Sequence, residues 1–395
     1  MPYYRAVGEI PRKRHTQFRK PDGGLYAEEL MGVEGFSSDS ALLYHRNLPT
    51  AIVDAEAVVD TGRETAPNLP LKPRHFRTQD LKWEDVYAVD AVSGRRRLFA
   101  NSDVSICFVA ATAPSPLYRN AFGDELLYVQ SGSGVVETIY GALTVGEGDY
   151  VVFPTSTTYR VLPDSELRLL VLEATGHIGP PRRYLATKGQ FLEHSPYCER
   201  DLRGPSEPLL ADQDEKDVPV LVRHRAGLTR FTYAHHPFDV VGWDGCLYPW
   251  AFNIRDFEPI TGRVHQPPPV HQTFEGPNFV VCSFCPRKVD YHPLAIPVPY
   301  NHANVDSDEL MFYVGGNYEA RKGSGIAVGS MSLHPSGCTH GPQPGAVEAA
   351  LGADYFDETA VMVDTFRPLQ LGAAAQECED PRYAWSWAGR GPDLG

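Results

Sequence analysis

A skeleton of spaced residues occurs twice in this chain of 395 residues. In the downstream copy the skeleton consists of His302, Glu309, Gly316, Gly329, Pro335, Gly337 and His340. In the upstream copy the same places hold Tyr118, Glu125, Gly132, Gly148, Pro154, Ser156 and Tyr159. Short apolar and aromatic segments lie between these residues and are punctuated by glycine, which is typical of antiparallel strands joined by tight turns. The repeat therefore predicts two similar β domains.

Only the downstream copy keeps two histidines beside the glutamate. A single histidine in a β domain is usually a packed or exposed group without special chemistry, but this reading weakens when His302, Glu309 and His340 all fall on a repeated skeleton. Two imidazoles and one carboxylate with open coordination positions favour non-haem Fe(II). Asp306 and Asp308 compete as the carboxylate; Glu309 is preferred because it alone shares the spacing of Glu125, which we interpret as structural.

Length and composition limit the class of protein. A chain of this length predicts about two domains, and its 35 glycines and 34 prolines suit short strands and turns. The formal charge of −14 argues against a nucleic-acid partner. No apolar run is long enough for a membrane span, the N-terminus lacks the apolar core of a signal peptide, and seven scattered cysteines suggest reduced cytoplasmic thiols.

The distribution of apolar runs predicts three segments. Residues 1–175 should contain an irregular N-terminal arm and a metal-free barrel, residues 176–237 a connection rich in proline and charge, and residues 238–395 the catalytic barrel. The run VMVDTF at 361–366 is expected to close the second barrel. The predicted fold class is mainly β.

The spacing H-x6-E-x6-G followed by G-x5-P-x-G-x2-H resembles the paired motifs of the cupin superfamily, which implies two cupin-type (jelly-roll) β-barrels. Longer runs resemble the homogentisate 1,2-dioxygenase family: GLYAEEL, DVVGWDGCLYPWAFNI, PYNHANVDSDELMF, NYEARKGS and GSMSLHPSGCTHGP. The resemblance implies an Fe(II) enzyme of tyrosine and phenylalanine catabolism that converts homogentisate and O2 to maleylacetoacetate. It also implies a homo-oligomer, a hexamer built as a dimer of trimers.

Roles for individual residues follow from the same resemblance. His302, Glu309 and His340 match the metal ligands, and His340 is also expected beside the substrate with Tyr318 and His334. His265 matches the acid–base histidine, and His271 is a rival for that role because the neighbouring region is shorter here.

Two other functions stay open at this point. One is a related dioxygenase acting on another dihydroxylated aromatic acid such as gentisate. The other is a non-enzymatic cupin that binds a metal or a small ligand. Oxygen uptake with a panel of hydroquinones and catechols would distinguish the related dioxygenase from one that acts on homogentisate. Bound iron without substrate-linked oxygen uptake would favour the non-enzymatic cupin.

Overall fold

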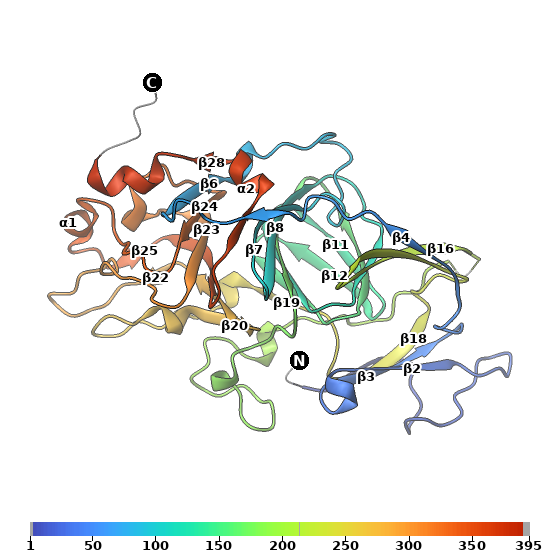
Figure 1. Cartoon of the computed structure of the whole chain (residues 1–395). Coiled ribbons are helices and arrows are strands. Elements are labelled where there is room, and N and C mark those ends of the chain that lie inside the picture. The colour runs from blue at the N-terminus through green and yellow to red at the C-terminus, as the bar shows by residue number, and fades with distance from the viewer. Residues whose placement is uncertain (1–2, 213, 390–395) are drawn as a thin grey trace. The chain divides into compact units, whose positions relative to one another are not determined.

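The computed structural model describes residues 3–212 and 214–389. The chain forms two compact units that interleave in sequence (Figure 1). The first contains residues 1–61, 85–95 and 109–253, and the second contains 62–84, 96–108 and 254–395. Their limits differ from the predicted segments, because residues 176–253 belong with the first barrel while 62–84 and 96–108 belong with the second.

The first unit is built almost entirely from strands. Three sheets carry them: β1-β18-β3-β2, β12-β11-β14-β9-β16-β17-β4, and the run β19-β13-β10-β15. Their bounds are β1 (Arg5–Gly8), β2 (Ala27–Gly32), β3 (Ser40–His45), β4 (Ile52–Val58), β9 (Leu117–Asn120), β10 (Glu125–Ser131), β11 (Ser133–Thr138), β12 (Gly141–Gly146), β13 (Asp149–Phe153), β14 (Thr158–Pro163), β15 (Leu167–Ala174), β16 (Val218–His224), β17 (Gly227–Tyr233), β18 (Val240–Gly245) and β19 (Trp250–Asn253).

The burial of these strands follows their sequence patterns. β12, GALTVG, alternates buried and exposed residues and so presents one face to water. β15, LRLLVLEA, is apolar almost throughout and is buried on both faces. The N-terminal segment, expected to be irregular, carries β1, β2 and β3, which pair with one another or with β18 (Figure 1). The apolar run ALLY within β3 accounts for this order, because its side chains are buried.

The second unit has one large antiparallel sheet in the order β20-β21-β26-β23-β24-β6-β28. β26, which contains most of the VMVDTF run, lies between β21 and β23 in the middle of this sheet, so the expectation that this run closes the barrel was wrong. The strand bounds are β5 (Thr65–Ala66), β6 (Arg74–Arg77), β7 (Arg96–Ala100), β20 (Gln272–Gly276), β21 (Phe279–Phe284), β22 (Arg287–Lys288), β23 (Asp308–Gly316), β24 (Ser330–His334), β25 (Tyr355–Phe356), β26 (Glu358–Thr365), β27 (Gln370–Gly372) and β28 (Glu379–Asp380).

Helices are few and short. The second unit has α1 (Ala346–Ala350), α2 (Ala373–Glu377) and 3-10 turns that include Pro268–His271, Glu319–Arg321 and Tyr383–Ala388. β8 (Val104–Ala111) is shared between the units: its residues up to 108 belong to the second unit and those from 109 to the first. The predicted fold class is confirmed in that the protein is mainly β, with its strands gathered in two units. No helix among the described residues is long and apolar enough to cross a membrane.

The two copies of the skeleton also share backbone conformations. Gly132 and Gly316 both have positive φ, 88° and 77°, and a Cβ at either position would come within 2.3 Å or 1.9 Å of a backbone oxygen. Ser156 keeps the left-handed φ of its counterpart Gly337, 69° against 79°, although a residue with a side chain pays about 1 kcal/mol for it. The duplication therefore extends to local conformations that the residue types alone do not require.

Candidate metal centre

Two histidines from separate segments meet across a backbone bridge in the second unit. His302 and His340 exchange hydrogen bonds between their main-chain N–H and C=O groups at 2.8 and 2.9 Å, and their ring centroids are 4.3 Å apart. Each Nδ1 lies 3.0 Å from the carbonyl oxygen two residues earlier, that of Tyr300 or Cys338. Because a carbonyl only accepts, each Nδ1 carries a proton, and each Nε2 is the ring atom left to bind a metal.

Glu309 completes the group from the second position of β23. Its Oε2 lies 3.5 Å from Nε2 of His302, and its Oε1 lies 3.5 Å from Nε2 of His340. One ligand atom from each of the three residues lies within 4.8 Å of the others, so the group could hold a metal ion. The sequence placed these three residues together correctly.

The electrostatics of the group suit a cation. Burial alone would raise the pKa of Glu309, but its interactions with His302, His334 and His340 hold that pKa well below its usual range, so the side chain is a carboxylate. Nε2 of His340 is buried and makes no hydrogen bond within the described chain. An unsatisfied imidazole nitrogen facing a carboxylate is costly unless a ligand binds there, and two neutral imidazoles with one carboxylate form a donor set that suits ferrous iron.

His334 also contacts the carboxylate of Glu309, through the same oxygen atom that lies near Nε2 of His340. Its Nδ1 lies 2.8 Å from Oε1 of Glu309, and its Nε2 lies 2.9 Å from the hydroxyl of Tyr383. Burial lowers the pKa of His334 to about 3, so its ring is neutral, donates from Nδ1 and accepts the Tyr383 proton at Nε2. Both nitrogens are occupied and the ring is fully buried, a geometry that suits positioning of Glu309. The predicted contact of His334 with substrate stays a prediction.

A cavity within the second unit opens onto His302 and Glu309. Apolar side chains form much of its wall, namely Phe284, Met311, Tyr313 and Met362, and Asn317 and Arg321 contribute polar groups. Arg321 donates to the hydroxyl of Tyr313 at 3.3 Å and to the carbonyl of Gly341 at 2.5 Å. No acidic side chain in the described part of the chain forms an ion pair with it, so a cation faces this cavity without a fixed counter-ion.

Both candidate acid–base histidines line the same cavity, but their surroundings differ. His265 is partly exposed, with Nδ1 3.4 Å from a carboxylate oxygen of Asp290 and its ring edge-on to Tyr300. His271 is buried and stacks on Phe284 with a centroid distance of 4.4 Å. Burial lowers the pKa of His271 to about 3, so this ring stays neutral at ordinary pH.

Tyr318 lies behind the cavity wall. Its ring packs edge-on against Tyr313 at 4.8 Å and against the cluster of Cys282, Met311, Tyr313, Ala360 and Met362, and its hydroxyl is buried. Its predicted contact with substrate stays a prediction, since the side chain supports Tyr313 and is not part of the cavity lining. Sequence reasoning missed Asp290, Arg321 and Tyr383, none of which belongs to the repeated skeleton; only the run NYEARKGS gave a signal for Arg321.

Comparisons with known proteins agree with this architecture. The N-terminal model of homogentisate 1,2-dioxygenase matches residues 4–254, and the C-terminal model matches residues 265–391. A protein of Saccharolobus solfataricus named "Putative dioxygenase" is 38% identical over 98% of this chain and 99% of its own length. Homogentisate 1,2-dioxygenase of Emericella nidulans is 28% identical over 86% of this chain and 80% of its own, and that of Rhodopseudomonas palustris is 27% identical over 97% and 90%. With these matches across both barrels, the chain belongs to the homogentisate 1,2-dioxygenase family.

Proposed function

We propose that this protein is an Fe(II)-dependent dioxygenase that opens the aromatic ring of homogentisate with O2 and forms maleylacetoacetate, both oxygen atoms entering the product. The observation that carries the proposal is the convergence of His302, Glu309 and His340 beside a cavity that His302 and Glu309 line and whose wall is partly apolar. In this proposal these three side chains hold the iron. When bound, iron would supply open coordination positions for substrate and O2 and the redox chemistry of the reaction.

Arg321 supports a substrate that carries a carboxylate. It is a cavity-lining cation with no acidic partner in the described chain, held in place by Tyr313 and Gly341. A guanidinium group binds a carboxylate through charge-assisted hydrogen bonds that orient it. In our account Arg321 holds the acetate arm, so that the ring points toward His302 and Glu309.

The side chains around the ring exclude water and shape its plane. Phe284, Met311 and Met362 offer apolar surface, and Tyr313 has its hydroxyl engaged by Ser332 and Arg321. A dry wall of this kind strengthens the electrostatic interactions inside the cavity and keeps water from a reactive intermediate.

The proton of the ring hydroxyl needs an acceptor, and His265 is the better candidate. Its Nδ1 lies 3.4 Å from a carboxylate oxygen of Asp290, so that carboxylate can orient the ring, as in other histidine–acid pairs. Among the described residues, no acid lies beside His271 to stabilise a bound proton, and burial lowers its pKa to about 3, so its ring is neutral near neutral pH. We assign the acid–base role to His265 and a packing role to His271.

The test is an anaerobic incubation of the iron-loaded full chain with homogentisate, followed by air, with O2 uptake and ring-opened product measured together. Stoichiometric uptake with product supports the proposal, and uptake with gentisate alone would move the assignment to that acid, whose carboxylate sits directly on the ring. Iron binding without uptake on any dihydroxylated acid would favour a non-enzymatic cupin.

Two matched variants test the acid–base assignment. His265→Gln should keep its iron but lose at least about 100-fold in turnover, the usual contribution of a general base. His271→Gln should keep turnover within a few-fold of wild type. The reverse order of effects would transfer the role to His271.

A further inference from the structure

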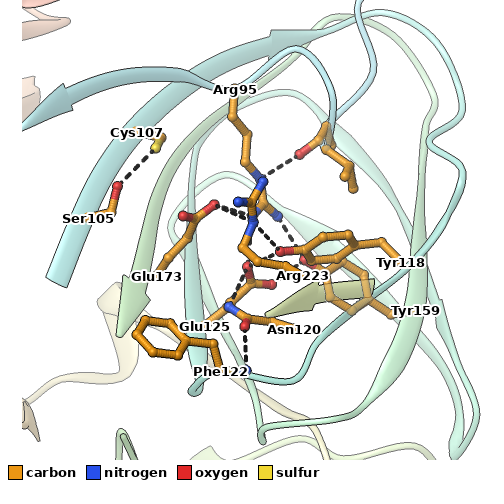
Figure 2. Close-up of polar contacts among 12 residues, drawn as sticks. Arg95, Ser105, Cys107, Tyr118, Asn120, Phe122, Glu125, Tyr159, Glu173 and Arg223 are labelled. Carbon is orange, nitrogen blue, oxygen red and sulfur yellow. Dashed lines mark hydrogen bonds and ion pairs between the residues drawn. The ribbon is translucent and has the colours of Figure 1, made fainter. Parts of the chain in front are cut away.

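A buried polar cluster occupies the first unit at the positions that correspond to the metal centre (Figure 2). Arg95 donates from Nη1 to Oε1 of Glu125 at 2.7 Å and to Oε1 of Glu173 at 2.9 Å, and from Nη2 to the hydroxyl of Tyr159 at 2.7 Å. Tyr118 and Tyr159 donate their hydroxyl protons to the two oxygens of Glu125 at 3.0 and 2.5 Å. The five side chains are at most 6% exposed. The cluster is closed to solvent.

The aromatic pairs of the two units correspond in register and in contact. Tyr118 and Tyr159 face each other across neighbouring strands, as His302 and His340 do across their bridge. One further ring stacks on the second member of each pair: Phe153 on Tyr159 at 4.0 Å and 14°, and His334 on His340 at 4.1 Å and 15°.

The acidic residues correspond as well. Glu125 and Glu309 each have a second acid as a direct neighbour on the adjoining strand, Glu173 in the first unit and Asp364 in the second. Each unit therefore places two carboxyl groups side by side in its interior, where an uncompensated pair of negative charges is strongly unfavourable.

The two units differ in the cation near this acid pair. In the first, Arg95 bridges both carboxylates. Arg223, which is paired with Asp60 at 2.8 Å, lies 3.9 Å from Glu173 and also contacts Tyr118. In the second, no lysine or arginine of the described residues forms an ion pair with Glu309 or Asp364, and Oδ1 of Asp364 is buried without a hydrogen bond. Among the described residues, the acid pair therefore has an arginine ion-paired to it in the first unit and no lysine or arginine ion-paired to it in the second.

We propose that the guanidinium group of Arg95 takes the place of a metal ion in the N-terminal barrel. Its charge is permanent, and its planar fork of N–H donors matches carboxylate oxygens. The barrel is therefore centred on a side-chain cation. The two tyrosines at the histidine positions donate hydrogen bonds to Glu125, whereas histidines at these positions would coordinate a metal. Arg95 excludes a metal from this position and stabilises the two buried carboxylates.

The direct test counts Co(II) ions bound to the full chain after gel filtration. The triple variant Arg95→Met/Tyr118→His/Tyr159→His should bind one more Co(II) per chain than wild type, and the double variant Tyr118→His/Tyr159→His, which keeps Arg95, should bind no more than wild type. An unchanged count in the triple variant, or an extra ion in the double variant, would overturn the proposal. Because the readout is a difference from wild type, it is independent of the activity proposed for the second unit.

A second measurement covers variants that fold poorly. Arg95→Met should lower Tm by at least about 5 °C, since removing one partner leaves buried charges unpaired. Adding Glu173→Gln removes one of those charges and should recover at least about half of the loss, or restore folding if Arg95→Met does not fold. Arg168→Met, which breaks a more exposed pair with Glu166 in the same unit, is the control and should leave Tm within about 1 °C. A loss that Glu173→Gln deepens, or a Tm equal to that of the control, would overturn the proposal.

Discussion

Removing one hydroxyl group, that of Tyr383, tests how the carboxylate of the candidate metal centre is held. The hydroxyl donates to Nε2 of His334 at 2.9 Å, and Nδ1 of His334 donates to Glu309 at 2.8 Å. Both rings are almost completely buried, so Tyr383→Phe leaves Nε2 of His334 without a partner and without access to water. We expect a loss of about 1 to 3 kcal/mol in the free energy of unfolding, the cost of one buried unsatisfied acceptor.

The same substitution should weaken metal binding, because His334 then loses the contact that fixes its orientation toward Glu309. Loss of an outer contact of this kind typically lowers metal affinity about 10- to 100-fold. The assay is urea unfolding of the metal-free protein together with anaerobic competition for Fe(II) against a chelator. Tyr140→Phe is the matched control, since it removes a buried hydroxyl that contacts the sulfur of Met31 in the first unit. An Fe(II) affinity of Tyr383→Phe within about twofold of wild type would refute the positioning role.

Three further predictions concern separate features of the chain. Gly316→Ala should cost more than about 2 kcal/mol of unfolding free energy in urea denaturation, because φ is 77° and the new Cβ would lie 1.9 Å from the carbonyl oxygen of Asp357; a stable variant would contradict the close approach. Burial alone would lower the pKa of His45, but its interactions with two carboxylates raise that pKa to about 9. The stabilisation from these pairs is therefore complete below about pH 6.5 and is lost as pH rises through 9, by at most about 3 kcal/mol. Over that range the Tm of wild type should fall more than the Tm of His45→Gln. Arg321→Met should raise KM for homogentisate about 10- to 100-fold with a smaller change in kcat, as expected for a lost charge-assisted contact; an unchanged KM in O2-uptake assays would remove Arg321 from the substrate site.

Much of the candidate metal centre could be predicted from the sequence, because its members lie on a repeated skeleton with fixed spacing. The two histidines and Glu309 come together as the shared spacing predicted. The repeat similarly predicted two barrels, since each copy specifies the same turns.

The remaining features depend on strand register and on chain paths that no local pattern records. Tyr383 reaches His334 from a 3-10 turn 49 residues away, and Arg95 reaches Glu125 from a loop 30 residues before it. Residues 62–84 and 96–108 belong to the second unit, which the sequence did not predict. Short strands such as β6 and β7 pair with strands far away in the sequence, and no local pattern records that pairing. The predicted oligomer and the cytoplasmic location stay predictions.

The most direct measurement is an anomalous difference map at the iron absorption edge from crystals of the iron-loaded protein. We expect one peak per chain, at bonding distance from Nε2 of His302, Nε2 of His340 and the carboxylate of Glu309, and no peak beside Arg95. A peak elsewhere, or iron between Glu125 and Glu173, would contradict this expectation.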